Sequence, residues 1–412
     1  MKKKRTSRRG SVYVLVLAAG VVLTSMGIAG LALVRAQRAA SDQTEAAQRA
    51  RLAAQSALGL GVRAITLDPT GLSWRSGATT GKLFTGMAIG DASCSAFVTD
   101  SAGGNLSDST AGRVIVSGTA NVGGARQAVS AEFVPAGTAY PVMQRALWAG
   151  GAMTLKGTVY ADSPIGSNVS VVGSGAIVKP QVLAPTTSGS TFSGGTGTTT
   201  VQTMPTSSVI DQWAAKATPI SFSSLPAGKI ENVVLSGGYN PYSTSVNSAG
   251  VYVIDCGGSA ITIRNCRISA TLILLNTGSF SIIRDNVLME PYYRNYPVLM
   301  VKGPMTISLA SGDLSEASLS VNYNPSGAPY RGVTDVDKTD SYPSEIYGVT
   351  YISGDATIDT NSTFEGVVLV GGTLTTSGTV TIRTHSPETA IDGFCSITGF
   401  KMRGSTWARS VN

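Results

Sequence analysis

The phrase GSAITIRN at residues 258–265 returns twenty residues later as GSFSIIRD at residues 278–285. Gly, Ser, Ile and Arg are identical at matching positions, and Asn265 matches Asp285. A repeat of about twenty residues corresponds to one turn of a small parallel β-helix, in which each rung stacks a buried row of side chains on the next. Glycine and asparagine suit the corners, where a positive φ is needed. The repeat therefore predicts a mainly β protein whose body is a parallel β-solenoid.

Gly-punctuated segments of alternating polarity lie before and after this repeat, at residues 149–178, 348–358, 364–374 and 377–382. We expect solenoid strands over residues 139–185 and 219–412. The phrases around Ile263 and Ile283 resemble those of right-handed β-helix proteins, and residues 371–380 resemble the C-terminal β domains of some pilus-associated proteins. Because the segments differ in length, a β-sandwich stays the alternative for this body.

Two interruptions separate the expected solenoid segments. Residues 186–206 are rich in Gly, Ser and Thr, a composition typical of a loop. Residues 207–218 predict a short helix, because Val209, Ile210 and Trp213 share one helical face. We expect this face to cap an open end of the β stack, since solenoids need end caps.

An uncharged stretch, SVYVLVLAAGVVLTSMGIAGLALV, occupies residues 11–34. As a helix it would be roughly 36 Å long, enough to span a bilayer, and it is longer than the apolar core of a cleaved signal peptide. Residues 1–10 form a basic leader with six Lys and Arg residues and no acid. Positive residues stay in the cytoplasm, so we expect a single-pass protein whose body lies outside the inner or cell membrane. The lipid bilayer is thus a predicted partner.

The helix is expected to continue to Ile65, because Ala, Gln, Arg and Glu dominate after residue 34. A sparse apolar stripe predicts an amphipathic second half, formed by Leu52, Ala53, Ala57, Leu58 and Leu60. Within residues 66–138, the stretch from Asp91 to Pro135 alternates in polarity, and Gly123-Gly124 indicates a hairpin turn. This segment predicts a small β layer packed on the helix.

These features resemble the type IV pilin-like superfamily, and most of all minor pilins of the PilX type. The resemblance rests on Arg9-Gly10, on the apolar run from Ser11 and on AAQRARLAAQSAL at residues 46–58. The strand pattern of the β layer adds to it through Ser117, Gly118, Arg126, Val129, Ala131 and Phe133. It implies that a prepilin peptidase cuts after Gly10, that Ser11 opens the mature chain, and that other pilin-like subunits are partners.

Two positions depart from the family pattern. Ser11 stands where members usually carry an aromatic residue, and Leu15 stands where most carry a glutamate that neutralises a neighbouring subunit's amino terminus. Some minor members at filament tips lack that glutamate. The departure argues against a repetitive shaft subunit.

Charge and histidine content exclude several classes of function. The net charge is +7, and six of the basic residues lie in the leader, so the remaining chain is nearly neutral and nucleic-acid binding is not expected. The single histidine, His385, excludes a His-rich metal site and leaves a Ser-His-Asp triad without support. No metal site and no cofactor are predicted.

Four cysteines occur without a CxxC pair. Cys256 and Cys266 are the nearest candidates for a disulfide in an exported body. The alternative is two small buried residues in the β core.

Carboxylates on neighbouring rungs could serve a polysaccharide-cleaving enzyme. The candidates are Asp255, Asp285, Glu290, Asp355 and Asp359, together with Arg264 and Arg284. The most site-like group is Arg264 and Arg284 beside Asp285, which we interpret first as an outward ladder of charges. Asp335, Asp337 and Asp340 offer oxygen ligands for an ion but lack the spacing of a known calcium loop. Tyr292, Tyr293 and Tyr296 suit either sugar stacking or turn packing.

The preferred hypothesis is a membrane-anchored, pilin-like surface protein, held in the membrane or in a filament after extraction, that displays a structural or adhesive β-solenoid and is not an enzyme. A surface polysaccharide is the ligand class considered. The alternatives are a membrane-tethered polysaccharide lyase or hydrolase and a plain single-pass envelope protein.

Overall fold

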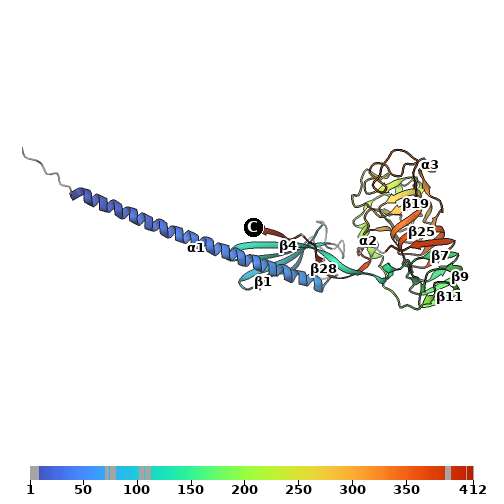
Figure 1. The fold of residues 1–412 in the computed structure, drawn as a ribbon, viewed down its shortest axis with the longest axis horizontal. Helices are drawn as coiled ribbons and strands as arrows, with labels where there is room; N and C mark the ends of the chain where they lie inside the picture. Colours follow the sequence, from blue (N-terminus) through green and yellow to red (C-terminus); the bar gives the residue numbers. More distant parts are fainter. Residues whose placement is uncertain are drawn as a thin grey trace, which may run out of the picture. The chain divides into compact units, whose positions relative to one another are not determined.

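The computed structural model describes residues 9–69, 74, 80–101, 106, 113–385, 391–404 and 406–411 (Figure 1). The chain divides into two compact units. The first contains residues 1–107, 112–135 and 399–412, and the second contains residues 108–111 and 136–398. Most of the basic leader lies outside the described residues.

One long helix, α1 (Arg9–Leu67), opens the first unit and agrees with the predicted helix over residues 11–65. Its buried residues lie in its second half and are Ala50, Ala53, Ala54, Ala57, Leu58, Gly61 and Ile65. The predicted apolar stripe is wrong at two positions, because Leu52 is 64% exposed and Leu60 is 39% exposed. Small alanines take the inner face instead, which lets a neighbouring strand approach the helix backbone. A Cβ at Gly118 would lie only 2.4 Å from the Ala54 carbonyl oxygen.

An antiparallel sheet packs on this half of α1. Its strands are β1 (Thr80–Ile89), β2 (Ala92–Asp100), β3 (Val114–Val122), β4 (Ala125–Ala139), β28 (Cys395–Met402) and β29 (Ala408–Val411). Gly123 and Gly124 form the predicted hairpin turn, both with positive φ, where Val122 pairs with Ala125. Burial alternates along β3, so one face of the sheet meets the helix.

The last strands of the chain correct the predicted domain boundaries. Residues 219–412 were expected to lie entirely in the solenoid, but β28 and β29 pair with β4 in the first sheet. β4 has one edge that β3 leaves free, and these returning strands satisfy its backbone groups. The solenoid is therefore an insertion between β4 and β28.

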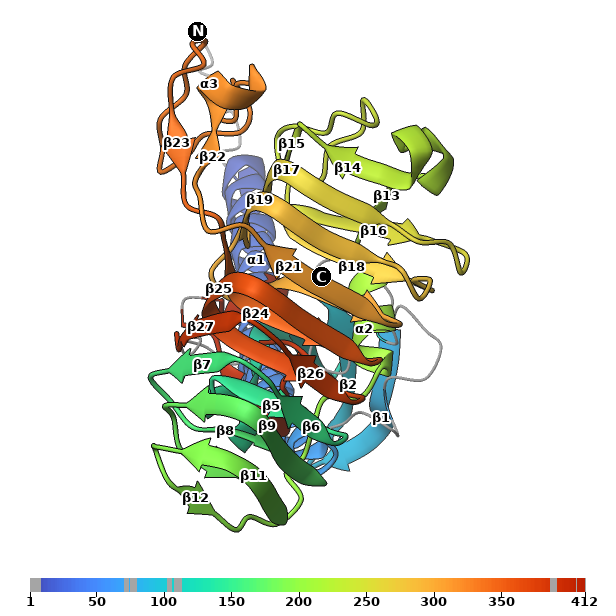
Figure 2. The same ribbon diagram turned by 90° about the vertical axis from the view of Figure 1, so that its right-hand side faces the viewer.

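The second unit is a stack of strands that pair in parallel (Figure 2). Its first part contains β5 (Leu147–Ala149), β6 (Met153–Leu155), β7 (Thr158–Ala161), β8 (Ile165–Ser167), β9 (Ser170–Val178), β10 (Val182–Leu183), β11 (Thr186–Phe192) and β12 (Thr196–Gly197). Its second part contains β13 (Thr218–Pro219), β14 (Lys229–Glu231), β15 (Val234–Ser236), β16 (Val251–Asp255), β17 (Thr262–Ser269), β18 (Thr271–Leu275), β19 (Ile282–Glu290), β20 (Pro297–Lys302), β21 (Met305–Leu309), β24 (Glu345–Ile352), β25 (Ala356–Val370), β26 (Leu374–Thr376) and β27 (Thr379–Arg383). Short 3₁₀ helices lie at η1 (Pro141–Gln144), η2 (Phe222–Ser224) and η3 (Pro226–Gly228). Parallel pairing throughout this stack is the predicted solenoid arrangement and differs from the antiparallel sheets of a β-sandwich.

The order of the stack does not follow the order of the chain. The chain winds from β5 to β12, restarts at β13, and winds back until β26 and β27 pair with β6 and β7. β25 likewise pairs with β5. The first coil in the sequence thus stacks on the last one.

The predicted loop over residues 186–206 is wrong in its first third. β11 (Thr186–Phe192) pairs in parallel with β9. Thr and Ser suit a pleated strand as well as a loop, and Gly189, with a φ of +86°, stacks directly on Gly173. A Cβ at Gly189 would clash with the Gly173 carbonyl oxygen.

The predicted short helix is present as α2 (Ser208–Ala214), but it does not cap an end of the stack. Val209, Ile210 and Trp213 are buried in a cluster with Ile273 and Met300, which point outward from the side of the solenoid. That side carries apolar residues on its outer surface, and the helix removes them from water.

A segment of residues 310–344 lies between β21 and β24, and we call it the insertion. It contains β22 (Leu314–Ser315), α3 (Glu316–Leu319) and β23 (Ser341–Tyr342). Leu314, Tyr323 and Tyr342 pack on Val234 and Leu288 of the solenoid. The insertion thus covers part of a second side.

Candidate functional site

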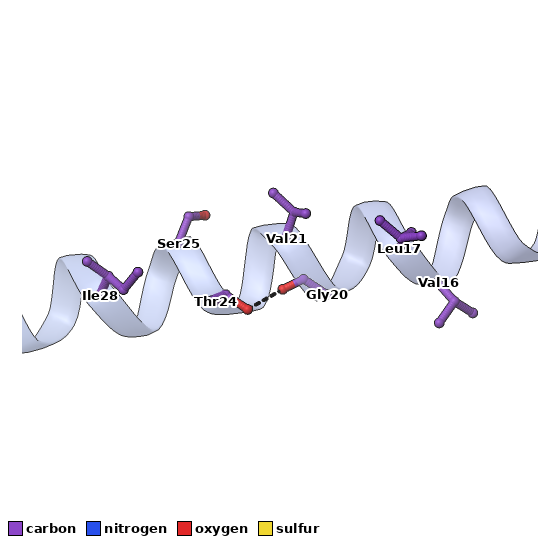
Figure 3. A pocket seen from close by; sticks show the side chains of 7 residues that line it. All are labelled: Val16, Leu17, Gly20, Val21, Thr24, Ser25 and Ile28. Carbon is purple, nitrogen blue, oxygen red and sulfur yellow. Dashed lines mark hydrogen bonds between the residues drawn. The ribbon is translucent and has the colours of Figure 1, made fainter.

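The apolar half of α1 is exposed along its length. Val16, Leu17, Gly20, Val21 and Ile28 stand on the helix surface together with two hydroxyl residues (Figure 3). Their hydroxyls donate within the helix, from Thr24 to the Gly20 carbonyl oxygen at 2.7 Å and from Ser25 to the Val22 carbonyl oxygen at 2.8 Å. Such hydrogen bonds leave no polar group of these side chains unsatisfied in an apolar medium.

This helix is long and apolar enough to cross a membrane, with a mean hydropathy of 2.3 in its most apolar window. None of that window is buried in the structure. The exposed side chains are those that lipid or neighbouring helices would contact. Gly10 lies in the first turn of α1, and nothing in the structure bears on its cleavage.

A third side of the solenoid is covered neither by α2 nor by the insertion within the described part of the chain. It contains β21, β26, β6 and the first parts of β17, β19 and β25, up to the corners at Asn265, Asp285 and Thr360 (Figure 2). We call it the open face. One outward row occupies equal register in successive coils and reads Thr262, Ile282, Thr306, Thr357, Thr375 and Thr154. Each of these side chains is half-buried, while its strand neighbours point into the core.

Arg264 and Arg284 lie on the same open face, in the row beside the threonines, and pair across adjacent coils. The Nε atom of Arg264 lies 3.2 Å from Glu231 Oε1 and 3.1 Å from Asp285 Oδ2. The structure therefore brings the predicted Arg264, Arg284 and Asp285 together and adds Glu231 from the preceding coil. Arg264 thus lies between two carboxylates, and Arg284 follows it at the same register in the next coil.

The match between Asn265 and Asp285 has a conformational cause. Their φ angles are +46° and +61°, the left-handed region that Asn and Asp tolerate better than other residues with a Cβ. Both residues turn the chain at the same corner of successive coils. The corner explains the match without a catalytic role.

The other candidate carboxylates are engaged in hydrogen bonds or an ion pair. Asp255 accepts from the Gly257 amide and from Asn276 Nδ2, which lowers the pKa of its carboxyl. Asp355 accepts from the amide and hydroxyl of Thr373. These two carboxylates fasten turns.

The remaining two candidate carboxylates, those of Asp359 and Glu290, are also engaged by neighbouring side chains. Asp359 accepts from Ser377 Oγ at 2.5 Å, and Glu290 binds the buried Arg267 at 2.7 Å.

The predicted aspartates of the insertion separate into two sets. Asp335 and Asp340 come together, and Glu316 joins them, so that one oxygen of each lies within 4.8 Å of the others. Asp337 instead accepts hydrogen bonds from the amide and hydroxyl of Thr339. Glu316 was missed by sequence reasoning, since it lies on α3, far from Asp335 along the chain.

The cysteines are free thiols in the structure. Cys256 and Cys266 both lie in the solenoid core, so the disulfide candidate is not formed and the alternative of small core residues describes them. Burial raises the pKa of Cys256 to about 11 and raises the pKa of Cys266 further. Neither thiol is activated as a nucleophile.

The aromatic candidates pack on one another. Tyr293 contacts Tyr292 and Tyr296 edge-to-face, with ring centroids 5.0 and 5.3 Å apart, and Tyr296 contacts Trp213 of α2 at 4.8 Å. This cluster is turn packing around α2. His385 is exposed, 5.9 Å from the Tyr347 ring.

No family model matches the chain, and no curated protein matches it. Among solved structures, it is similar to the competence-associated pilin ComZ from Thermus thermophilus, with 10% identity, 89% of this chain and 98% of that chain covered, and a TM-score of 0.27. An ice-binding protein from an Antarctic biological consortium is 13% identical, with 60% and 92% covered and a TM-score of 0.29. An ice-binding protein domain from Shewanella frigidimarina is 12% identical, with 60% and 98% covered and a TM-score of 0.27.

Proposed function

We propose that this chain is a membrane-anchored, pilin-like surface protein that displays the solenoid as a structural or adhesive module. The observation that carries the proposal is the division of α1 into two halves. Residues 12–34 are apolar and exposed, whereas the buried face from Ala50 to Ile65 packs on an antiparallel sheet. The first half suits a bilayer, or neighbouring helices after extraction from it, and the second half suits a folded head outside.

The topology supports a separation of roles between the two units. The solenoid is inserted between β4 and β28, and the helix and its sheet have a core of their own. Assembly and anchoring belong to this first unit in the proposal, and display belongs to the second. Leu15 in place of the usual glutamate favours a minor subunit over a shaft subunit.

The mature amino terminus tests the pilin-like part of the proposal. In a host with an active prepilin peptidase, intact-mass measurement is expected to show a chain that begins at Ser11. Gly10→Val should block the cut, whereas Gly20→Ala, a glycine change in open space on the same helix, should leave it unaffected. A wild-type chain that still begins at Met1 would remove the strongest argument for the pilin-like assignment.

The open face supports an adhesive role for the solenoid. Four threonines follow one another there in successive coils, a fifth lies beyond Ile282, and parallel strands place neighbours in this row about 4.8 Å apart. A regular row of half-buried methyl and hydroxyl groups suits a ligand that is itself a repeating surface, such as an ordered polysaccharide or ordered water. We propose this face, and not a catalytic cleft, as the functional surface.

Binding assays test this role. The full chain in detergent should sediment with insoluble polysaccharides or slow ice recrystallisation, and Thr306→Lys with Thr357→Lys should abolish the effect. Thr381→Lys is the matched control, because Thr381 points outward from β27, away from the row. Equal loss in the control would assign the effect to charge and not to the open face.

A further inference from the structure

The insertion gathers three carboxylates that are distant along the chain. Glu316 comes from α3, Asp335 from the following loop, and Asp340 from the residue before β23. One oxygen from each lies within 4.8 Å of the other two. Together with Asn324 we call these residues the Glu316 cluster.

No arginine or lysine in the described part of the chain forms an ion pair with these carboxylates. Glu316 is fully buried, and its oxygens accept from the Tyr323 amide, the Tyr342 hydroxyl and the Asp340 amide. Buried carboxylates are otherwise paired with a cation or bound to a metal. The hydrogen bonds orient Glu316, but they do not neutralise three neighbouring acids.

The buried arginine that binds the insertion does not pair with the cluster. Arg267 is fully buried and donates to the carbonyl oxygens of Tyr323, Ala328 and Pro329 and to Glu290. These hydrogen bonds join three carbonyl groups of the insertion to Arg267 of β17, which also binds Glu290 of β19. The cluster therefore needs a positive charge from another source.

Asn324 supplies a second, independent observation. Its side chain is 2% exposed, and its carboxamide lies between Asp335 and Asp340, to whose Oδ2 atoms Nδ2 donates at 3.0 and 3.1 Å. Its Oδ1 atom is buried and has no hydrogen-bond partner, and the same holds for Asp335 Oδ1. A half-turn of the amide exchanges Nδ2 for Oδ1 and directs a carbonyl oxygen to the carboxylates.

We propose that the Glu316 cluster binds a calcium ion. Calcium takes oxygen ligands from carboxylates and amides at 2.3–2.6 Å, so two ligands on opposite sides of the ion are about 4.6–5.2 Å apart. The three cluster oxygens lie within 4.8 Å of one another, so all three can reach one ion at such distances. Magnesium requires a tighter octahedron, and zinc prefers His and Cys ligands, which the cluster lacks. The ion gives a partner to the two buried oxygens that lack one, Asn324 Oδ1 and Asp335 Oδ1.

The position of the cluster gives the ion a structural role. Its ligands come from the beginning, the middle and the end of the insertion, so one ion joins all three parts. Arg267 holds the inner side of the same segment. Burial, together with Asp335, Glu316 and Asp337, raises the pKa of Asp340, and a bound cation would reverse that effect.

Calcium titration of the purified full chain in detergent tests the site. Thermal unfolding should shift to higher temperature with calcium and saturate, because a ligand that binds only the folded state stabilises it. Magnesium at the same concentration should have little effect. Terbium should give luminescence on excitation of tyrosine, since the Tyr342 hydroxyl lies 2.9 Å from Glu316.

Matched variants distinguish calcium binding at this specific site from a nonspecific effect of negative charge in the insertion. Asp335→Asn and Asp340→Asn should each weaken calcium binding at least tenfold. Asp337→Asn makes the same charge change in the same insertion and should alter binding less than twofold. With EDTA present, Asp340→Asn should melt at or above the wild-type temperature, which shows that it folds. Absence of any calcium shift and of terbium luminescence, or an equal loss in Asp337→Asn, would overturn the proposal.

Discussion

At the scale of single residues, Arg267 is the buried charge on which the insertion depends. Its guanidinium is 0% exposed, contacts four acceptors and lies 5.0 Å from the Tyr330 ring. An arginine suits this position because its planar fork reaches several acceptors at once. The buried role of Arg267 could not be predicted from the sequence, because three of its four acceptors are backbone carbonyl groups.

Arg267→Ala should destabilise the protein by about 3–5 kcal/mol, because Glu290 and three carbonyl oxygens lose their buried donor. Denaturant unfolding measures the change, and limited proteolysis should cut the insertion first. Arg383→Ala is the control, as its ion pair with Glu365 is exposed on the arginine side and should be worth less than about 1 kcal/mol. Equal effects of the two changes would contradict this account.

Gly118 is the residue that brings β3 against α1. Gly118→Ala should cost about 2 kcal/mol or more, because the added Cβ meets the helix backbone at 2.4 Å. Gly59→Ala is the same substitution on α1 in open space, and it should stabilise by about 1 kcal/mol through helix propensity. Thermal unfolding of both variants checks the opposite signs.

At the scale of elements, α2 covers an apolar side of the solenoid. Trp213 is 3% exposed and donates from Nε1 to the Asp392 carbonyl oxygen at 3.0 Å. Trp213→Ala should cost about 3–5 kcal/mol and expose the outer residues of that side, as unfolding and binding of an apolar dye would report. Asp211→Asn, which removes an exposed ion pair to Lys302 from the same helix, should cost less than about 1 kcal/mol.

The stability of the folded insertion should decrease as pH rises, because the pKa of Asp340 is raised in the folded protein. Its pKa is raised in the folded protein, so between the unfolded and folded pKa values the native state binds more protons, and this contribution to stability is lost as pH rises. With EDTA present, wild-type stability relative to Asp340→Asn should therefore fall as pH increases above the ordinary aspartate range. Thermal unfolding across that range measures the difference, and a rising difference would contradict the assignment.

Some of these elements could be predicted from the sequence, and others could not. The Ile263 and Ile283 repeat was visible because both coils turn at the same corner, where Asn265 and Asp285 share a left-handed φ. The strand at residues 186–192 was missed because its Thr, Ser and Gly content suits a loop equally well. The Glu316 cluster was only partly visible, since its four members meet through the fold and not through spacing.

At the scale of the whole molecule, the long helix, the β layer and the parallel body were predictable from local patterns. The return of β28 and β29 to the first sheet was not, because any edge strand accepts a partner through backbone groups that carry no sequence information. The same holds for the meeting of β27 with β7. Parallel neighbours can be distant in the chain, so the stacking order is a property of the fold.

The inserted topology predicts that the first unit folds without the solenoid. β4 and β28 are antiparallel neighbours, as the Tyr140 amide bonds to the Phe394 carbonyl oxygen and the Arg403 amide to the Glu132 carbonyl oxygen. Replacing residues 140–394 by a short turn should leave a helical, protease-resistant unit, measured by circular dichroism and trypsin digestion in detergent. Loss of the folded sheet would show that the solenoid is required for it.

The discontinuous stacking also determines how the solenoid carries tension. The two connections to the solenoid enter at β5 and leave at β27, and these belong to coils that stack on each other. A force applied between the start of β5 and the end of β27 acts on the contact between these two coils, which we call the seam. The parallel strands of the seam must slide past one another before the solenoid opens. The coils beyond the seam, toward β12 on one side and β13 on the other, are outside the line of force and stay folded while the seam holds.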